Sequence, residues 1–357
     1  MSTNARLYYA VVQMGVANPG SNVFREVHGL QSVGLTTNFT LDQIFEIGQI
    51  EIYENKEGSP EIQLTAQKVL DGYPLIYHLA TQQAGNPSLA GRSRATCILG
   101  LSTFDDTKES ASGNPLAEVI MSGMYVNSLS YTFNVDGSFT EDLTFQGQSK
   151  IWKTSNYVLT GVFQNNDSPY AITGSGGINQ RQNFVWADST NGGTTRDANS
   201  MVGTVVASVI PPDIDGITSS GTNPLQVDGS RSAHVQSISV STDLNRKELF
   251  ELGRKTPYFR SPQFPVPVNC SITTLMKEMD NVDAFENVDN LTNRTIKIKS
   301  QEGTFINLGT KNKLQSVDVG GGDTGGGEFT LTYNYVTQNT LLVIHPQDPV
   351  TAFRTPQ

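Results

Sequence analysis

A sequence block that occurs twice is the feature that most constrains this chain. Residues 31–48 read QSVGLTTNFTLDQIFEIG, and residues 236–253 read QSISVSTDLNRKELFELG. The blocks align without a gap at an offset of 205 residues, and six of the eighteen aligned positions are identical. At the same offset Tyr53 aligns with Tyr258, and Pro60 aligns with Pro265. Self-similarity of this length indicates a tandem duplication of one structural unit.

A second pair of blocks follows in the same order. Residues 127–145 read NSLSYTFNVDGSFTEDLTF, and residues 315–333 read QSVDVGGGDTGGGEFTLTY, an offset of 188. Each block predicts a strand, a Gly-rich turn and a second strand. We interpret the tract GGGDTGGG at 320–327 as a hairpin turn. A phosphate-binding loop would need a following Lys-Ser/Thr and a helix, and neither is indicated here.

The pattern within each unit predicts a mainly β fold. Residues 31–37 alternate between larger and smaller or polar side chains, which is typical of a strand with one buried face. A loop follows at 46–60 and at 251–265, then a strand and one short helix, predicted over 68–81 and 273–285. Strands return at 94–101 and 294–300. We therefore expect two tandem β-sandwich or barrel domains, each with one short helix.

The predicted domain organisation is a β domain at 1–164, a linker or arm at 165–200, and a second β domain at 201–357. The linker is rich in Gly, Asn and Ser, and residues 213–232 have a similar composition. Such stretches are too polar for a core and too long for simple turns. We expect linkers, or arms that become ordered on a neighbouring subunit.

The charge and the cysteines exclude several classes of protein. The formal net charge is −10, whereas a protein that grips duplex DNA usually presents a basic surface. Like charge would instead keep DNA from sticking. Cys97 and Cys270 form no CxxC or Cys/His cluster, so we expect buried, inert thiols in a reducing compartment. The apolar stretch at 7–16 is too short to span a bilayer, so no membrane partner is expected.

No catalytic, cofactor or metal site is predicted, and the chain is not expected to be an enzyme. No nucleophile elbow accompanies the histidines, which we interpret as structural or surface groups. The aspartates of the 213–228 region lack calcium-loop spacing. Glu46 and Glu251 occur once in each copy, so they favour a capping or interface role over a paired-acid site. The four histidines are His28, His78, His234 and His345, and the three aspartates are Asp213, Asp215 and Asp228.

The repeated block resembles a known family. The run ELFELG, a loop with Tyr258 and Pro265, and the extended segment 258–268 are similar to the major tail tube proteins of tailed bacteriophages. The run GINQRQN at 177–183 also resembles phage tail sequences. The resemblance covers most of the second copy and extends to the first. It implies a small β-sandwich or barrel with a flanking helix, whose sheets join between neighbouring units into one barrel that lines a channel.

In that family the long loop of each unit contacts the adjacent ring. The resemblance therefore assigns inter-ring stacking to the two loops, through Glu46, Gly48, Tyr53, Pro60, Glu251, Gly253, Tyr258 and Pro265. Most tubes have six such units per ring. Two units per chain imply a trimer with pseudo-sixfold symmetry, and a hexamer with one copy on the outer wall is the alternative.

The expected function is a structural subunit of a phage tail tube, polymerising as stacked rings into a hollow channel for DNA ejection into the host. The implied partners are other copies of the chain, the tape measure protein and transiting DNA in the lumen, and a sheath protein outside. The implied location is the virion tail, assembled in the host cytoplasm. Two alternatives stay open: a tube-like tail terminator or baseplate hub component, and a carbohydrate-binding β protein. The last would need a cleft with exposed Trp, and the chain has only Trp152 and Trp186.

Overall fold

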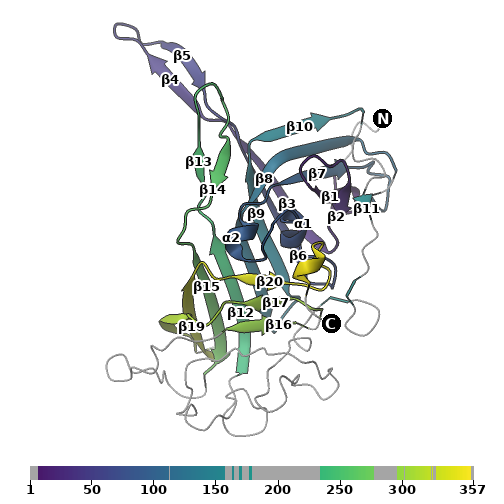
Figure 1. Cartoon of the computed structure of the whole chain (residues 1–357), viewed down its shortest axis with the longest axis vertical. Coiled ribbons are helices and arrows are strands. Elements are labelled where there is room, and N and C mark those ends of the chain that lie inside the picture. Colours follow the sequence, from purple (N-terminus) through teal and green to yellow (C-terminus); the bar gives the residue numbers. More distant parts are fainter. Residues whose placement is uncertain are drawn as a thin grey trace.

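The chain is mainly β, as expected, and two small α-helices pack against its sheets (Figure 1). The computed structural model describes residues 7–111, 113–156, 163–164, 169–170, 177–178, 234–276, 296–300, 302–322, 324 and 327–354. The predicted linker at 165–200 and the polar stretch at 213–232 lie outside these residues, apart from 169–170 and 177–178. No helix in the described part of the chain is both long and apolar enough to cross a membrane.

Within the described residues, the N-terminal repeat contributes eleven strands and two α-helices. Its elements are η1 (Tyr9–Val11), β1 (Val12–Ala17), β2 (Phe24–Glu26), β3 (Leu30–Asn38), β4 (Leu41–Phe45), β5 (Ile52–Glu57), β6 (Glu61–Val69), α1 (Ile76–Ala80), α2 (Leu89–Arg92), β7 (Cys97–Thr103), β8 (Ala117–Asn134), β9 (Thr140–Gly147), β10 (Ser149–Lys153) and β11 (Phe163–Gln164).

The C-terminal repeat contributes the remaining described elements. They are β12 (His234–Asp243), β13 (Lys247–Leu249), β14 (Phe259–Ser261), β15 (Pro267–Leu275), β16 (Lys297–Lys299), β17 (Phe305–Asn307), β18 (Lys313–Gly321), β19 (Phe329–Gln338), β20 (Leu342–Ile344) and η5 (Thr351–Phe353).

Eight antiparallel strands from the two repeats form one continuous sheet. Their order is β3-β6-β9-β8-β12-β15-β19-β18, with the first four from the N-terminal repeat and the last four from the C-terminal repeat. Each repeat therefore arranges its four strands in the same order. The repeats meet where β8 pairs with β12, and we call this pairing the internal joint. Strands β3 and β18 lie at the two ends of the sheet.

Two β-bulges occur at equivalent places in both repeats. The register of β3 on β6 shifts between Leu30 and Ser32, and that of β12 on β15 shifts between Val235 and Ser237, exactly 205 residues later in both positions. The register of β8 on β9 shifts between residues 126 and 128, and that of β18 on β19 between 314 and 316, an offset of 188. Strand pairing does not require a bulge, so recurrence at both equivalent places marks a shared architecture.

The pairing corrects the alignment of the second sequence blocks. Phe145 lies opposite Leu64, and Tyr335 lies opposite Cys270, which makes Tyr335 the structural equivalent of Phe145. The offset in this strand is therefore 190 and not 188. The GGGDTGGG tract connects the antiparallel strands β18 and β19, as the interpretation as a hairpin requires; Gly320 and Gly321 belong to β18, and residues 323, 325 and 326 lie outside the described part of the chain. That turn is two residues longer than its counterpart, which explains the change in offset.

The helix predictions were correct only in part. In the 68–81 segment the first two residues end β6, and α1 covers only Ile76–Ala80. Gly72 adopts a left-handed conformation with φ +83°, which a continuous helix does not allow. The helix predicted at 273–285 is contradicted at its start, because Thr273 and Thr274 lie in β15, where β-branched residues fit well. Its remainder from residue 277 lies outside the described residues.

One large apolar core extends through both repeats, and a small separate cluster contains Ala17 and Phe24. The large core lies on one face of the eight-stranded sheet, where Tyr131, Phe145, Val240 and Cys270 are at most 1% exposed. Helix α1 packs on this face against β8 and β9. The 18-residue β8 also pairs with β7 and β10, so it belongs to a second layer as well. The prediction of buried free thiols at Cys97 and Cys270 is confirmed, and burial raises the pKa of both.

Candidate functional site: arms, sheet edges and a polar face

Both predicted stacking loops are β-hairpins, which we call arm 1 (β4–β5) and arm 2 (β13–β14). The two arms have the same register, because Asp42 pairs with Lys56 and Lys247 pairs with Ser261, each 205 residues apart. Arm 1 projects furthest from the body of the molecule (Figure 1). Gly48 and Gly253 turn the two tips with φ +101° and +88°, a conformation that favours glycine.

The arm tips present apolar side chains to solvent. Ile47 and Leu252 occupy equivalent positions, and each is 103% exposed. Ile50 in arm 1 is 98% exposed, and Tyr53 and Tyr258 are 64% and 50% exposed. The tip carboxylate Glu251 pairs with Arg254 of its own arm at 3.1 Å. Large apolar groups clustered on a projecting hairpin are typical of a contact surface.

The predicted site residues divide into two groups. The tips hold Glu46, Gly48, Glu251 and Gly253, whereas Pro60 and Pro265 lie at the bases, just before β6 and β15. The structure therefore gathers the residues of each copy on one arm, and it keeps the two sets on separate arms. The assignment of these residues to contacts between rings stays a prediction, because the structure holds one chain.

Arm 2 is fixed to the N-terminal repeat by a partly buried arginine. Arg246 donates from Nε to the carbonyl of Val126 at 2.8 Å and from Nη2 to the carbonyl of Ser93 at 2.6 Å. Its guanidinium lies over the ring of Tyr125, 4.8 Å from the centroid, and that ring also meets Phe259 edge-on at 6.0 Å. Burial lowers the pKa of Arg246 to about 10, so the group stays cationic at neutral pH.

A second arginine and a glutamine complete this attachment. Arg260 is 1% exposed, pairs with Glu248 at 2.6 Å and donates to the carbonyl of Gly147 at 3.4 Å. Gln148 donates from Nε2 to the carbonyl of Pro257 at 3.2 Å. The contacts with Gly147 and Gln148 join the C-terminal repeat to the N-terminal repeat, so they support the internal joint, whereas the pair with Glu248 lies within arm 2.

Arm 1 lacks the corresponding arginines. The positions equivalent to Arg246 and Arg260 hold Leu41 and Asn55, and both strands of arm 1 are exposed along their whole length. A single ion pair, from Glu57 to Lys255 of arm 2 at 3.2 Å, joins the arms, and both groups are well exposed. Such a pair contributes little to stability in water. Arm 1 is therefore a projecting element with few contacts inside its own chain.

Among the residues that the structure describes, both ends of the eight-stranded sheet are open edges. Within the described residues, β3 pairs only with β6, and β18 pairs only with β19. At the internal joint the equivalent strands are fully covered: Ile238 and Val240 are at most 2% exposed, and Tyr131 is completely buried. At the free end Val319 is 48% exposed. Unpaired strand edges with partly exposed apolar residues favour pairing with another chain.

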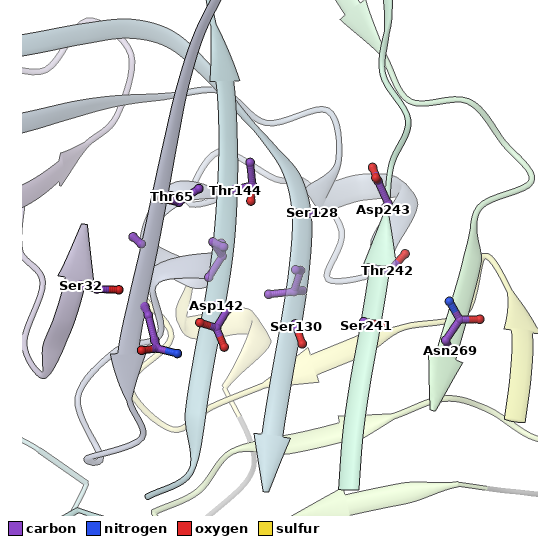
Figure 2. Close-up of a pocket in the computed structure, with 14 residues that line it drawn as sticks. Ser32, Thr65, Ser128, Ser130, Asp142, Thr144, Ser241, Thr242, Asp243 and Asn269 are labelled. Atoms are coloured by element: carbon purple, nitrogen blue, oxygen red, sulfur yellow. The ribbon is translucent and has the colours of Figure 1, made fainter. Parts of the chain in front are cut away.

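The face of the sheet opposite the core is lined by short polar side chains. A shallow groove runs across it, and its lining residues come from β3, β6, β9, β8, β12 and β15 (Figure 2). The carboxylates there are Asp142 and Asp243, and Asp318 lies on the same face of β18. The other outward-facing residues at the strand centres are Ser32, Thr36, Gln63, Thr65, Ser128, Ser130, Thr132, Thr144, Ser239, Ser241, Asn269, Ser271, Thr332 and Asn334. None of these positions holds Lys or Arg.

A buried ionic cluster fastens the C-terminal segment to the N-terminal repeat. Arg92 pairs with Asp348, and both side chains are 0% exposed. His345 contacts Glu302 at 2.9 Å, and His78 contacts the carbonyl of Val343 at 3.1 Å. Burial and the charge of Arg92 hold the pKa of His78 well below its usual range. The cluster is closed to solvent, which fits the interpretation of these histidines as structural groups.

Sequence reasoning missed the residues that attach arm 2 and those that line the polar face. Arg246 and Arg260 had a weak signal, because each stands where the first copy has an uncharged residue. The polar face had a clearer one, since Ser, Thr or Asp occupies every second position of 128–132 and 237–243. Within the described residues, no group of three or more His, Cys, Asp and Glu is placed to hold a metal ion.

No protein-family profile matches the chain, and no curated protein shows significant sequence similarity to it. Solved structures do align with it. A chain of the anti-feeding prophage baseplate, determined by cryo-electron microscopy with six-fold symmetry, aligns with a TM-score of 0.31 and 11% identity over 44% of this chain and 100% of that chain. A chain of the extended sheath–tube complex of PVC, an extracellular contractile injection system, aligns with a TM-score of 0.30 and 9% identity, over 43% and 95% respectively.

Proposed function

We propose that this chain is a structural subunit of a phage tail tube, in which three copies form a pseudo-sixfold ring and rings stack into a channel for DNA. The observation that carries the proposal is the sheet itself. Each repeat orders its four strands identically, and the strand types that meet at the internal joint are the same types left open at the two ends. A heterologous contact between such ends closes into a ring when the rotation per chain divides the circle.

The composition of the polar face supports its placement on the wall of a channel. In a ring closed through β3 and β18, one face of the sheet points inward. The polar face carries hydroxyls, amides and carboxylates, and the apolar face is already covered by α1 and the second layer. Phosphates bind proteins through Lys and Arg, and a wall of Ser, Thr and Asp offers them no such partner. DNA or a tape measure protein could then pass without being held.

The arms support stacking. Their tips expose Ile47, Ile50 and Leu252 almost completely, beyond the edge of the sheet. Association would remove this apolar surface from water, which is the main favourable term in most protein contacts. Stacking on the next ring is the contact that we assign to Glu46, Gly48, Tyr53, Pro60, Glu251, Gly253, Tyr258 and Pro265. A sheath, where present, would cover the outer layer.

Electron microscopy of the purified chain in negative stain, together with mass photometry of the soluble fraction, tests the proposal. We expect hollow tubes or stacked rings with three chains in each ring. Single rings that never stack would favour a tail terminator or hub component. Six chains per ring would place one repeat on the outer wall. A chain that stays monomeric at high concentration would overturn the assembly function.

A further inference from the structure

We propose that the ring contact copies the internal joint residue by residue: β3 of one chain pairs antiparallel with β18 of a second copy, and arm 1 docks on that copy as arm 2 docks on its own N-terminal repeat. This inference rests on the proposed function, and it adds the register and the contacting groups. The repeat itself supplies both, because every strand of the joint has a known equivalent at the open ends.

The register follows from two offsets. In the internal joint Ser241 of β12 lies opposite Ser130 of β8, and Val240 lies opposite Tyr131. Residues of β3 precede their β12 equivalents by 205, and residues of β18 follow their β8 equivalents by 188. The transferred register pairs Asn38 with Ser316, Thr37 with Val317, Thr36 with Asp318, Leu35 with Val319 and Gly34 with Gly320.

The transferred register keeps apolar side chains on one face of the sheet and polar side chains on the other, as in the internal joint. It puts Leu35 beside Val319 on the apolar face, and Thr36 beside Asp318 on the polar face. A slip by one residue would send every side chain to the opposite face. The joint also completes a partly built core, because Leu35 is half-buried whereas its equivalent Val240 is 1% exposed.

One hydrogen bond between arm 2 and the N-terminal repeat has equivalent residues for both its donor and its acceptor at the proposed ring contact. Gln148 donates to the carbonyl of Pro257 in arm 2. The position equivalent to Gln148 is Gln338, the same residue type, and the position equivalent to Pro257 is Ile52 of arm 1. We therefore expect Gln338 of the partner subunit to donate to the carbonyl of Ile52.

At a second arm contact, the residue types of the internal joint and of the proposed ring contact differ. In the internal joint Tyr125 meets Phe259 edge-on. Their equivalents are Lys313 and Glu54, which replace an aromatic pair by opposite charges. Both residues are exposed in the single chain. Charge complementarity of this kind steers association and fixes register.

Engineered disulfides test the register. Residues directly opposite in an antiparallel pair have Cα atoms about 4.5–5.5 Å apart, within the range that a disulfide spans. The double variant Thr36→Cys/Asp318→Cys should therefore cross-link neighbouring chains on oxidation. The control Thr36→Cys/Ser316→Cys is displaced by two residues, so its Cα atoms would be about 8 Å apart and should not cross-link. The two edges of one chain lie seven strand spacings apart, so a link within one chain is not possible.

Non-reducing gel electrophoresis should show bands of two and three linked chains for Thr36→Cys/Asp318→Cys, with no larger species, and mostly single chains for the control. Equal cross-linking of both variants, or of neither in preparations where microscopy shows rings, would overturn the register and leave the tube function standing. The absence of rings from the unmodified chain would instead overturn the function.

Charge reversal gives a second, independent measurement. Glu54→Lys and Lys313→Glu should each raise the protein concentration needed for ring formation, by about three- to tenfold at low salt, and the double variant should bring it back towards the original value. Reversal of Glu109, an exposed carboxylate away from both edges, should leave that concentration unchanged. If the two substitutions together raise this concentration by the product of their separate effects, the arm contact is overturned, because two residues in direct contact should compensate each other when both charges are reversed.

Discussion

Removal of the Asp348 carboxylate should destabilise the chain far more than removal of an exposed partner. Asp348 and Arg92 are both 0% exposed, and Arg92 also donates from Nη1 to Thr81 Oγ1 at 2.7 Å. In Asp348→Ala the guanidinium stays buried without its counter-charge. Breaking a buried pair in this way costs about 3–5 kcal/mol, which is a large part of the stability of an ordinary domain.

The geometry adds a smaller contribution to that loss. Asp348 Oδ1 accepts from the backbone N–H of Val350 at 3.0 Å, which helps to order the C-terminal turn. The Arg92 guanidinium also lies 5.3 Å from the ring centroid of Phe353 in that turn. We therefore expect the 342–354 segment to loosen first, with faster hydrogen exchange there than in β8 or β12.

Urea unfolding at low protein concentration is the assay, because assembly would otherwise add to the apparent stability. The matched control is Arg254→Gln, which breaks the half-exposed pair with Glu251 and should cost less than about 1 kcal/mol. Replacement of both Arg92 and Asp348 by apolar residues should recover much of the loss. A cost below about 1 kcal/mol for Asp348→Ala would refute the assignment of this pair as the fastening between the repeats.

Three further predictions concern the core, the pH dependence and the arms. Ile238→Ala at the internal joint should cost about 2–5 kcal/mol in urea unfolding, whereas Leu35→Ala at the open edge should cost less than half as much, and equal costs would contradict the difference in burial. Burial raises the pKa of Glu141 to about 7, above its unfolded value, so ionisation of Glu141 lowers the free energy of unfolding as pH rises from about 4.5 to 7. Glu141→Gln should remove this loss, so the gain in the free energy of unfolding from pH 5 to pH 7 should be larger in the variant. The depressed pKa of His78 acts in the opposite sense, with stability lost as pH falls below about 6.5, so His78→Gln should make that gain smaller. Ile47→Asp, at a fully exposed tip, should leave unfolding within about 0.5 kcal/mol of the original and prevent rings from stacking, and a normal tube length by microscopy would contradict the stacking role.

The repeat could be found from sequence because it preserves side-chain alternation along single strands. The blocks at 31–48 and 236–253 share a register that local pattern alone reveals. The order of strands in the sheet was not accessible in the same way. Strand β8 follows β7 in the chain, yet it lies between β9 and β12, and only tertiary pairing decides this. The pair of Arg92 and Asp348 is also hidden, because its members are 256 residues apart.

The short helices show a second limit. The apolar spacing at 273–276 fits a helix and a strand equally well over so few residues, and pairing with β12 and β19 decides for the strand. The arms show a third limit. Their Gly and Pro positions were visible, but residues 41–57 and 247–261 pair as hairpins through backbone hydrogen bonds that no side-chain pattern specifies.

The divergence of the two repeats becomes intelligible when their joints are compared. The internal joint connects parts of one chain and can be permanent. It is closed by bulky residues such as Tyr131 and Phe133, and the partly buried Arg246 and the buried Arg260 hold arm 2 against it. The equivalent positions at the open edges hold Val319 and Gly321, and arm 1 has no arginine at the corresponding places. Fewer buried groups mean a smaller loss on separation. We propose that a joint between chains built in this way forms only when several contacts act together, as they would in a closed ring.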